Sequence, residues 1–174
     1  HVVKVLCFCH PGDDAAVQAA QEATVTRLFH AARRNRLEFL LEIIPSKVGP
    51  VDDDTNARLI RRFYQIGIFP DWWKLEPMRS DAAWAATVAA ISENDPYVRG
   101  IVVLGLGQSE EELAASFQLA ARYPLVKGFA VGRTIFAKAA EQWMAGRLAD
   151  AESVELMANN FRRLCTIWDA ARGG

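Results

Sequence analysis

Five short apolar runs alternate with longer amphipathic stretches along the chain, and this alternation restricts the fold more than any other feature of the sequence. The runs are VVKVLCFC (2–9), LEFLLEII (37–44), DWWKLE (71–76), GIVVLGL (100–106) and VKGFAVG (126–132). They are almost continuously hydrophobic, as is typical of parallel strands that are covered on both faces. Strands that alternate with helices predict an α/β fold built from parallel βα units.

The stretches between and after these runs carry the signals of helix ends. Ser80 and Ser109 are each followed by acidic residues, as at a helix N-cap, and Glu112 completes a capping box with Ser109. Helices are predicted over 13–34, 53–67, 80–94, 109–123, 134–146 and 151–171. No linker rich in serine and glycine interrupts them, so residues 1–174 are predicted to form a single α/β domain.

Composition argues against several classes of partner. The 174 residues carry a net charge of −1 and the basic residues are scattered, so neither nucleic acid nor a membrane surface is an expected partner. No apolar stretch approaches the roughly 20 residues that span a bilayer. The three cysteines have no metal-ligand spacing, and Cys7 and Cys9 alternate along a predicted strand as buried structural thiols do. Cysteines of this kind favour a location in the reducing cytoplasm over a secreted, disulfide-bonded protein, and no metal site is predicted.

The carboxyl ends of the five predicted strands are where chemistry is expected. They read HPGDD, EIIPSK, KLEP, GLGQS and VGRT, and all of them carry polar, glycine or proline residues. In βα folds, ligands bind at the carboxyl ends of the strands. A functional site is therefore predicted at this edge of the sheet.

Lys74 is the first candidate for a catalytic residue, because it interrupts the apolar segment PDWWKLEP. Beside Trp72, Trp73 and a leucine, its ammonium group would be poorly solvated. Desolvation favours the neutral amine, which is a nucleophile for a carbonyl carbon. The structural alternatives are a lysine that extends to solvent, or an ion pair with Glu76 on the same face of the strand.

Lys4 and Glu42 lie inside two other predicted strands, again in apolar company. A second lysine near Lys74 would disfavour the charged form through repulsion, and a carboxylate between two lysines could shuttle protons. A mutual ion pair of Lys4 and Glu42 is the purely structural interpretation. Three interior charges on three neighbouring strands are more than a structural core usually tolerates, which keeps a catalytic role as open as the structural one.

Two glycine-containing turns near the end of the chain predict a phosphate site. The segments LGLGQS, with Gly105 and Gly107, and FAVGRT, with Gly132, place glycine where a strand passes into a helix. Such turns expose backbone N–H groups at the positive end of a helix, and Arg133 adds a guanidinium group that can bind phosphate through two hydrogen bonds. In barrels, phosphate sites often follow the last two strands.

His10 is a further candidate at the end of the first predicted strand, in the segment CHPGDD. It is either an acid–base or substrate-binding group, or a loop histidine that caps or faces water. Asp13 and Asp14 are interpreted as anions at a helix N-terminus rather than as metal ligands, and the acidic run at 51–54 is interpreted in the same way.

Taken together and in order, five segments resemble a known protein family. They are KVLCFCHPGDD, FLLEIIPSK, PDWWKLEP, VVLGLGQSEEELAASF and PLVKGFAVGRTIF. They resemble the domain fused behind the sugar kinase in bacterial bifunctional inositol-catabolism proteins, which belongs with the class I, Schiff-base aldolases of the tagatose-bisphosphate aldolase type. The resemblance extends over nearly all of residues 2–171. It implies a TIM (β/α)8 barrel, of which this chain would supply strands 4 to 8 as a partial barrel.

The resemblance also implies an activity that needs neither a metal nor another cofactor. The implied reaction is cleavage of the phosphorylated sugar acid 2-deoxy-5-keto-gluconate 6-phosphate into dihydroxyacetone phosphate and malonate semialdehyde, which would make the protein a lyase of myo-inositol catabolism. By position in these segments, Lys74 matches the Schiff-base lysine of the family, Glu42 its proton-shuttling carboxylate, and Lys4 its second lysine.

The phosphate-binding positions of the family are matched as well. Gly105 and Gly107 match the turn after the seventh barrel strand, and Gly132 with Arg133 matches the phosphate loop after the eighth. The family's aspartate on the first strand, which handles the substrate hydroxyl, has no counterpart here. An Arg-Tyr-Asn segment of other relatives is replaced by CFCHP.

Five βα units do not close an eight-stranded barrel. The other strands are therefore expected in a longer, kinase-fused chain, or two copies are expected to associate as a homo-oligomer that covers the open edges. An isolated domain that is inactive as it stands is a further alternative. The alternative function is a non-catalytic module that binds a sugar phosphate and regulates an attached carbohydrate kinase. A lyase for another keto-sugar phosphate is a third possibility.

Overall fold

The computed structural model describes residues 1–173, in which five strands are each followed by a helix and a sixth helix ends the chain. The strands are β1 (Val2–Cys7), β2 (Glu38–Ile43), β3 (Trp72–Leu75), β4 (Gly100–Val103) and β5 (Val126–Phe129). The helices are α1 (Ala15–Arg34), α2 (Thr55–Gln65), α3 (Asp81–Asn94), α4 (Glu110–Ala120), α5 (Arg133–Met144) and α6 (Asp150–Ala171). A short 3-10 helix, η1 (Pro45–Lys47), was not predicted. Within the described residues, no helix has the length and apolar character needed to cross a bilayer.

The five strands form one parallel sheet in the order β1-β2-β3-β4-β5. Strands that are consecutive in the sequence are neighbours in space, as in a segment of a barrel. This confirms the predicted α/β fold of parallel βα units. The capping box of Ser109 and Glu112 at the start of α4 is confirmed as well.

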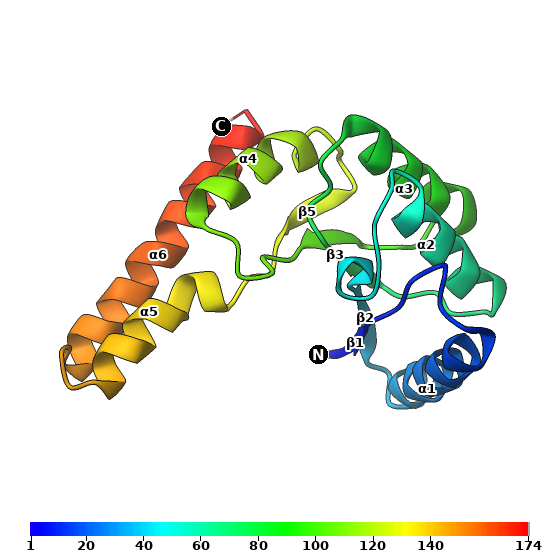
Figure 1. Cartoon of the computed structure of the whole chain (residues 1–174), viewed down its shortest axis with the longest axis horizontal. Coiled ribbons are helices and arrows are strands. Elements are labelled where there is room, and N and C mark those ends of the chain that lie inside the picture. The colour runs from blue at the N-terminus through cyan, green and yellow to red at the C-terminus, as the bar shows by residue number, and fades with distance from the viewer. Residues whose placement is uncertain (174) are drawn as a thin grey trace.

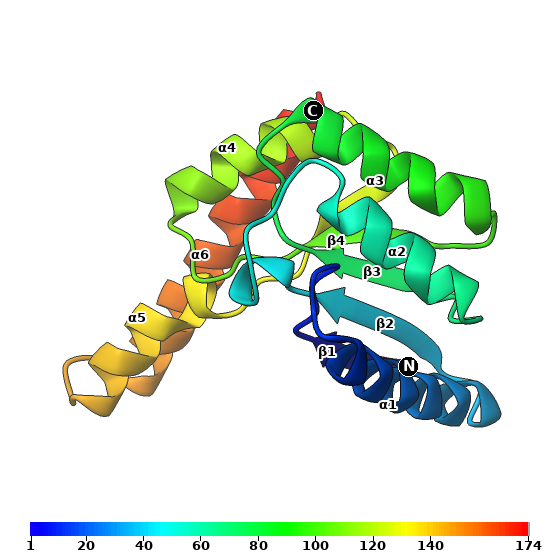
Figure 2. The ribbon, with the colours of Figure 1, turned by 45° about the vertical axis from the view of Figure 1, so that its right-hand side comes forward.

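One face of the sheet packs against helices and forms the hydrophobic core. Alternate residues, such as Phe39 and Leu41 of β2 and Trp73 of β3, point to this face and have no exposed surface. Figures 1 and 2 show α1 to α4 as an outer layer along this side of the sheet. Cys7 and Cys9 lie in the same core as free thiols, which confirms their prediction as buried cysteines.

The opposite face of the sheet carries no helices, so the prediction that both faces are covered holds for one face only. Val2 and Leu6 of β1 are partly exposed on this second face. Helices α5 and α6 form a hairpin that contacts α4 through α6 and extends away from the sheet (Figure 1). Side chains of the second face, of the loops that follow the strands and of the first turn of α5 line a common cavity.

Candidate active site

Three charged side chains from three neighbouring strands meet on the face of the sheet that carries no helices. Glu42 of β2 stands directly beside Lys74 of β3 in the strand register. The Lys74 Nζ lies 3.2 Å from Glu42 Oε1, and the Lys4 Nζ, from β1, lies 2.5 Å from Glu42 Oε2. The structure therefore brings the three predicted catalytic residues together, with the carboxylate between two ammonium groups.

The three side chains differ in their access to water. The exposed fraction is 7% for Glu42, 15% for Lys74 and 47% for Lys4. A carboxylate with so little solvent needs compensating charge, and two cations supply it. Lys74 is the less exposed of the two lysine side chains, and its Nζ lies within proton-transfer distance of Glu42, an arrangement suited to acid–base chemistry at an amine.

Of the two tryptophans next to Lys74, Trp73 lies on the opposite face of the sheet, contrary to the expectation that both surround the amine. Successive residues of a strand point to opposite faces. Trp73 therefore lies in the helix-covered core, where its Nε1 donates to Tyr64 Oη at 3.0 Å. Trp72 shares the face of Lys74 but begins β3, and its Nε1 donates to Glu38 Oε2 at 2.8 Å. The polar contact of the Lys74 amine is thus to Glu42 of the neighbouring strand β2 and not to a residue of its own segment.

Glu76, the alternative partner of Lys74, is engaged elsewhere. Its buried carboxylate accepts hydrogen bonds from the backbone N–H of Ser46, at 3.0 Å, and from the Ser46 hydroxyl. These bonds tie the segment after β3 to η1. Lys74 pairs with Glu42 instead, so the expected ion pair between Lys74 and Glu76 is wrong.

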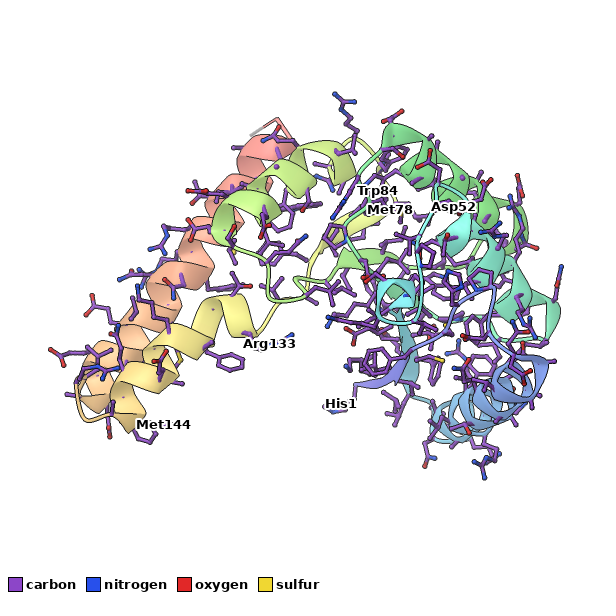
Figure 3. All side chains as sticks on the ribbon, viewed as in Figure 1. His1, Asp52, Met78, Trp84, Arg133 and Met144 are labelled. Carbon is purple, nitrogen blue, oxygen red and sulfur yellow. The ribbon has the colours of Figure 1, made fainter. Side chains whose placement is uncertain are left out.

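The two glycine-containing turns lie against each other after β4 and β5. A Cβ at Gly105 would come within 2.9 Å of Val131 Cγ1, and one at Gly107 would lie 3.8 Å from the guanidinium carbon of Arg133. Gly107 has a φ of +77°, in the left-handed region that favours glycine. Gly132 is the N-cap of α5. Arg133 is therefore the first residue of the helix and carries the first of the backbone N–H groups that have no partner within it. Figure 3 shows Arg133 beside the space between the hairpin and the sheet.

One cavity of about 350 Å³ joins the charged cluster to the glycine turns. This volume lies in the range of small-molecule sites, about 300–1,000 Å³. Every predicted site residue except His10 lines it: Lys4, Glu42, Lys74, Gly105, Gly107, Gly132 and Arg133. The amine, the carboxylate and the turns that suit a phosphate therefore face one shared space.

His10 lies outside this cavity and serves the loop that follows β1. Its Nδ1 accepts from the Gly12 N–H at 3.0 Å, which leaves the proton on Nε2, and Nε2 donates to the Pro50 carbonyl at 2.9 Å. Asp13 accepts from the His10 N–H, and Asp14 caps α1. Across residues 1–173, no group of three or more His, Cys, Asp or Glu side chains is placed to hold a metal ion.

Lys47 and Thr134 line the cavity too, and sequence reasoning missed both. Lys47 ends η1 in the segment EIIPSK, so the signal for it was a basic residue just beyond the end of a strand. Thr134 Oγ1 donates to the Gln108 carbonyl at 3.2 Å and ties the start of α5 to the loop before α4.

Comparisons with known proteins identify one family and a larger set of similar solved structures. A family model described as "Uncharacterized protein conserved in bacteria (DUF2090)" matches residues 1–172. The fructose-bisphosphate aldolase of Plasmodium falciparum, solved in complex with TRAP and a small-molecule inhibitor, superposes with a TM-score of 0.65 at 17% identity. Cgl0159 of Corynebacterium glutamicum superposes with a TM-score of 0.53 at 20% identity. No match was found among the curated proteins.

These similarities show the fold and the extent of the match. The match to the aldolase covers 99% of this chain and 56% of the aldolase chain. The match to Cgl0159 covers 91% of this chain and 49% of the Cgl0159 chain. The chain therefore spans about half the length of both. Its five-stranded parallel sheet belongs with aldolase-like TIM-barrel folds.

Proposed function

The chain belongs to the DUF2090 family, and from the cluster of Lys4, Glu42 and Lys74 we propose that it acts as a class I aldolase through a Schiff base. The observation that carries the proposal is the contact of Lys74 with Glu42, 3.2 Å apart, in a cavity that also holds the glycine turns and Arg133. A sheltered amine, a carboxylate within proton-transfer distance and a phosphate-binding turn are the parts that this reaction needs. The aldolase-like fold supports the same assignment.

In the first step, Lys74 forms a covalent bond with the substrate ketone. The neutral amine attacks the carbonyl carbon, and the resulting carbinolamine takes up a proton and loses water, which leaves a positively charged iminium. Glu42 accepts the proton that Lys74 gives up and returns a proton to the departing hydroxyl. Lys4, at the other carboxylate oxygen, compensates the charge of Glu42 while it is ionised.

The second step breaks a carbon–carbon bond. A base takes the proton of the hydroxyl on the carbon β to the iminium carbon, the aldehyde leaves, and the bonding electrons move into an enamine. Protonation of the enamine carbon and addition of water then release the ketone and regenerate Lys74. In the family that the sequence resembles, an aspartate on the first barrel strand handles this hydroxyl, and this sequence has no counterpart of it.

Phosphate binding by the glycine turns and Arg133 would position the substrate. Binding energy from this remote group holds the carbonyl against Lys74 and converts binding into rate. Following the sequence resemblance, we propose 2-deoxy-5-keto-gluconate 6-phosphate as the substrate. The same resemblance suggests a role in inositol catabolism, within a kinase-fused cytoplasmic protein.

We also propose that these residues are the carboxyl-terminal five βα units of an eight-unit barrel. β1 and β5 both form edges of the sheet, and the two similar solved chains are about twice as long. Leu6, Phe8 and Phe136 are exposed apolar residues on the cavity wall, which three further βα units would cover. If the protein sediments as a dimer, a second copy covers the open edges of the sheet. If it sediments as a monomer, a second copy is ruled out, and the three further βα units are expected within a longer polypeptide.

Borohydride trapping tests the aldolase proposal. The protein is incubated with dihydroxyacetone phosphate and sodium borohydride, digested, and analysed by mass spectrometry. We expect a reduced adduct on Lys74, no adduct at that position in Lys74→Ala, and loss of turnover in the same variant. Lys127→Ala is the matched control, because the Lys127 Nζ donates to the Pro124 carbonyl at 2.8 Å and the residue does not line the cavity.

Two outcomes would refute the proposal. If Lys74 stays unlabelled while sugar phosphates still bind, the protein is the non-catalytic binding module. If Lys74→Ala keeps substantial turnover, the Schiff base does not lie on the reaction path.

A further inference from the structure

The cavity has two cationic poles, and we propose that Lys47 binds a carboxylate group of the substrate while Arg133 binds its phosphate. The inference rests on the proposed function, because it assigns the second charged end of the same substrate. It makes Lys47 the residue that distinguishes a phosphorylated keto acid from an uncharged keto-sugar phosphate.

The charges that line the cavity do not balance within the protein. Lys4, Lys47, Lys74 and Arg133 are cationic, and Glu42 is the single carboxylate on the cavity wall within residues 1–173. Lys4 and Lys74 share that carboxylate. Among the described residues, Lys47 and Arg133 take part in none of the ion pairs. Two free cations in one cavity suit a ligand with two anionic groups.

The fold places these two cations at opposite sides of the reacting amine. Lys47 follows β2, whereas Arg133 follows β5, and β3 with Lys74 lies between them in the sheet. Three steps between neighbouring strands correspond to about 14 Å. Because both side chains are long and line the same cavity, an extended sugar acid phosphate can contact both while its ketone lies near Lys74.

The two poles suit different anions. At Arg133, the start of α5 adds backbone N–H groups beside the guanidinium, which suits the several oxygens of a phosphate. On either side of Lys47 the backbone N–H groups are already used: that of Ser46 donates to Glu76, and that of Val48 donates to the Pro45 carbonyl of η1. Lys47 thus offers a single ammonium group, which matches the single charge of a carboxylate.

The charge of the covalent intermediate agrees with this assignment. With the iminium on Lys74, the cavity carries four positive charges, the others being Lys4, Lys47 and Arg133, against one negative charge on Glu42. The cavity then has a net charge of +3. A substrate with a phosphate dianion and a carboxylate brings three negative charges and neutralises it. A phosphate alone would leave the Lys47 charge without a partner.

A matched pair of non-reacting ligands tests the inference. The compounds 6-phosphogluconate and sorbitol 6-phosphate differ only in a carboxylate against a hydroxymethyl group, and neither contains a ketone. Calorimetric titration of the protein should show that 6-phosphogluconate binds about tenfold more tightly, as expected for one charge-assisted contact. Lys47→Gln should remove this preference, Lys47→Arg should keep part of it, and Arg133→Gln should weaken both ligands. Lys127→Gln, which makes the same change of charge outside the cavity, should preserve it.

The inference is overturned if the wild-type protein shows no preference, or if Lys47→Gln retains it. Because these ligands form no covalent bond, the result is independent of trapping at Lys74. An adduct without a Lys47-dependent preference would leave the aldolase proposal standing and remove this one. A Lys47-dependent preference without an adduct at Lys74 would retain the carboxylate site and reject the Schiff base.

Discussion

Replacing Glu42 with glutamine tests the charge arrangement at the centre of the site. The variant keeps the side-chain shape but removes the negative charge that faces Lys4 at 2.5 Å and Lys74 at 3.2 Å. At an effective dielectric constant of about 20, each contact is worth about 5–7 kcal/mol before desolvation. Desolvation of the buried carboxylate offsets several kcal/mol of this, and water screens the half-exposed Lys4. We therefore expect the free energy of unfolding to fall by about 1–3 kcal/mol.

The same substitution should slow turnover, since glutamine neither accepts nor returns a proton. General acid–base catalysis contributes about 10²- to 10⁴-fold, so kcat should fall within that range. Glu38→Gln is the matched control on the same strand and face: Glu38 pairs with Arg99, accepts from Trp72 and does not line the cavity. Urea unfolding followed by tryptophan fluorescence gives the stability. A kcat for Glu42→Gln within about twofold of the Glu38→Gln value would refute proton transfer by Glu42.

Two other positions give sharp expectations. Tyr64→Phe leaves the buried Trp73 Nε1 without its partner and should cost about 1–3 kcal/mol in urea unfolding, whereas Tyr97→Phe, at an exposed tyrosine, should change little. Burial raises the pKa of Tyr64. The neutral side chain therefore contributes its full stability below about pH 10, and this stability is lost as the pH rises from there towards the pKa of the folded state. Over this alkaline range, Tyr64→Phe should lose less stability than the wild-type protein. Gly107→Ala, at a φ of +77°, should cost about 1 kcal/mol and weaken sorbitol 6-phosphate binding, whereas Gly146→Ala, at a φ of +66° in open space, should match its stability loss but bind normally.

Parallel βα units leave a strong pattern in a sequence, which is why the element order is predictable here. All five strands and six α-helices are predicted, and the helices start within two residues of the expected positions. The strand ends are less predictable. The apolar run 100–106 continues past Val103, but β4 stops there because the chain turns at Leu106, with a φ of 47°, and Gly107. Hydrophobicity does not mark the point at which a chain leaves its sheet.

The membership of the site is predictable where it follows from strand periodicity, and not where it depends on loops. Period-two alternation places Lys74 and Glu42 on the side of the sheet away from the helices. The ion-pair partner of Lys74 is Glu42 on the neighbouring strand, and the pairing of strands cannot be read from one strand alone. An ion pair with Glu76 on the same predicted strand is therefore a reasonable expectation, but it is wrong. His10 follows a strand as the others do, but the loop turns its ring towards the Pro50 carbonyl and away from the cavity.

The strand register gives the two lysines different parts in the proposed reaction. Glu42 stands level with Leu6 on one side and with Lys74 on the other. Lys4 lies two residues before Leu6, about 7 Å nearer the amino end of β1, so its long side chain must extend towards the carboxylate. Ligands enter a βα sheet from the carboxyl ends of the strands. Lys74 therefore meets an entering ketone at the level of Glu42, whereas Lys4 approaches the carboxylate from the far side, where it can compensate charge but is poorly placed to attack.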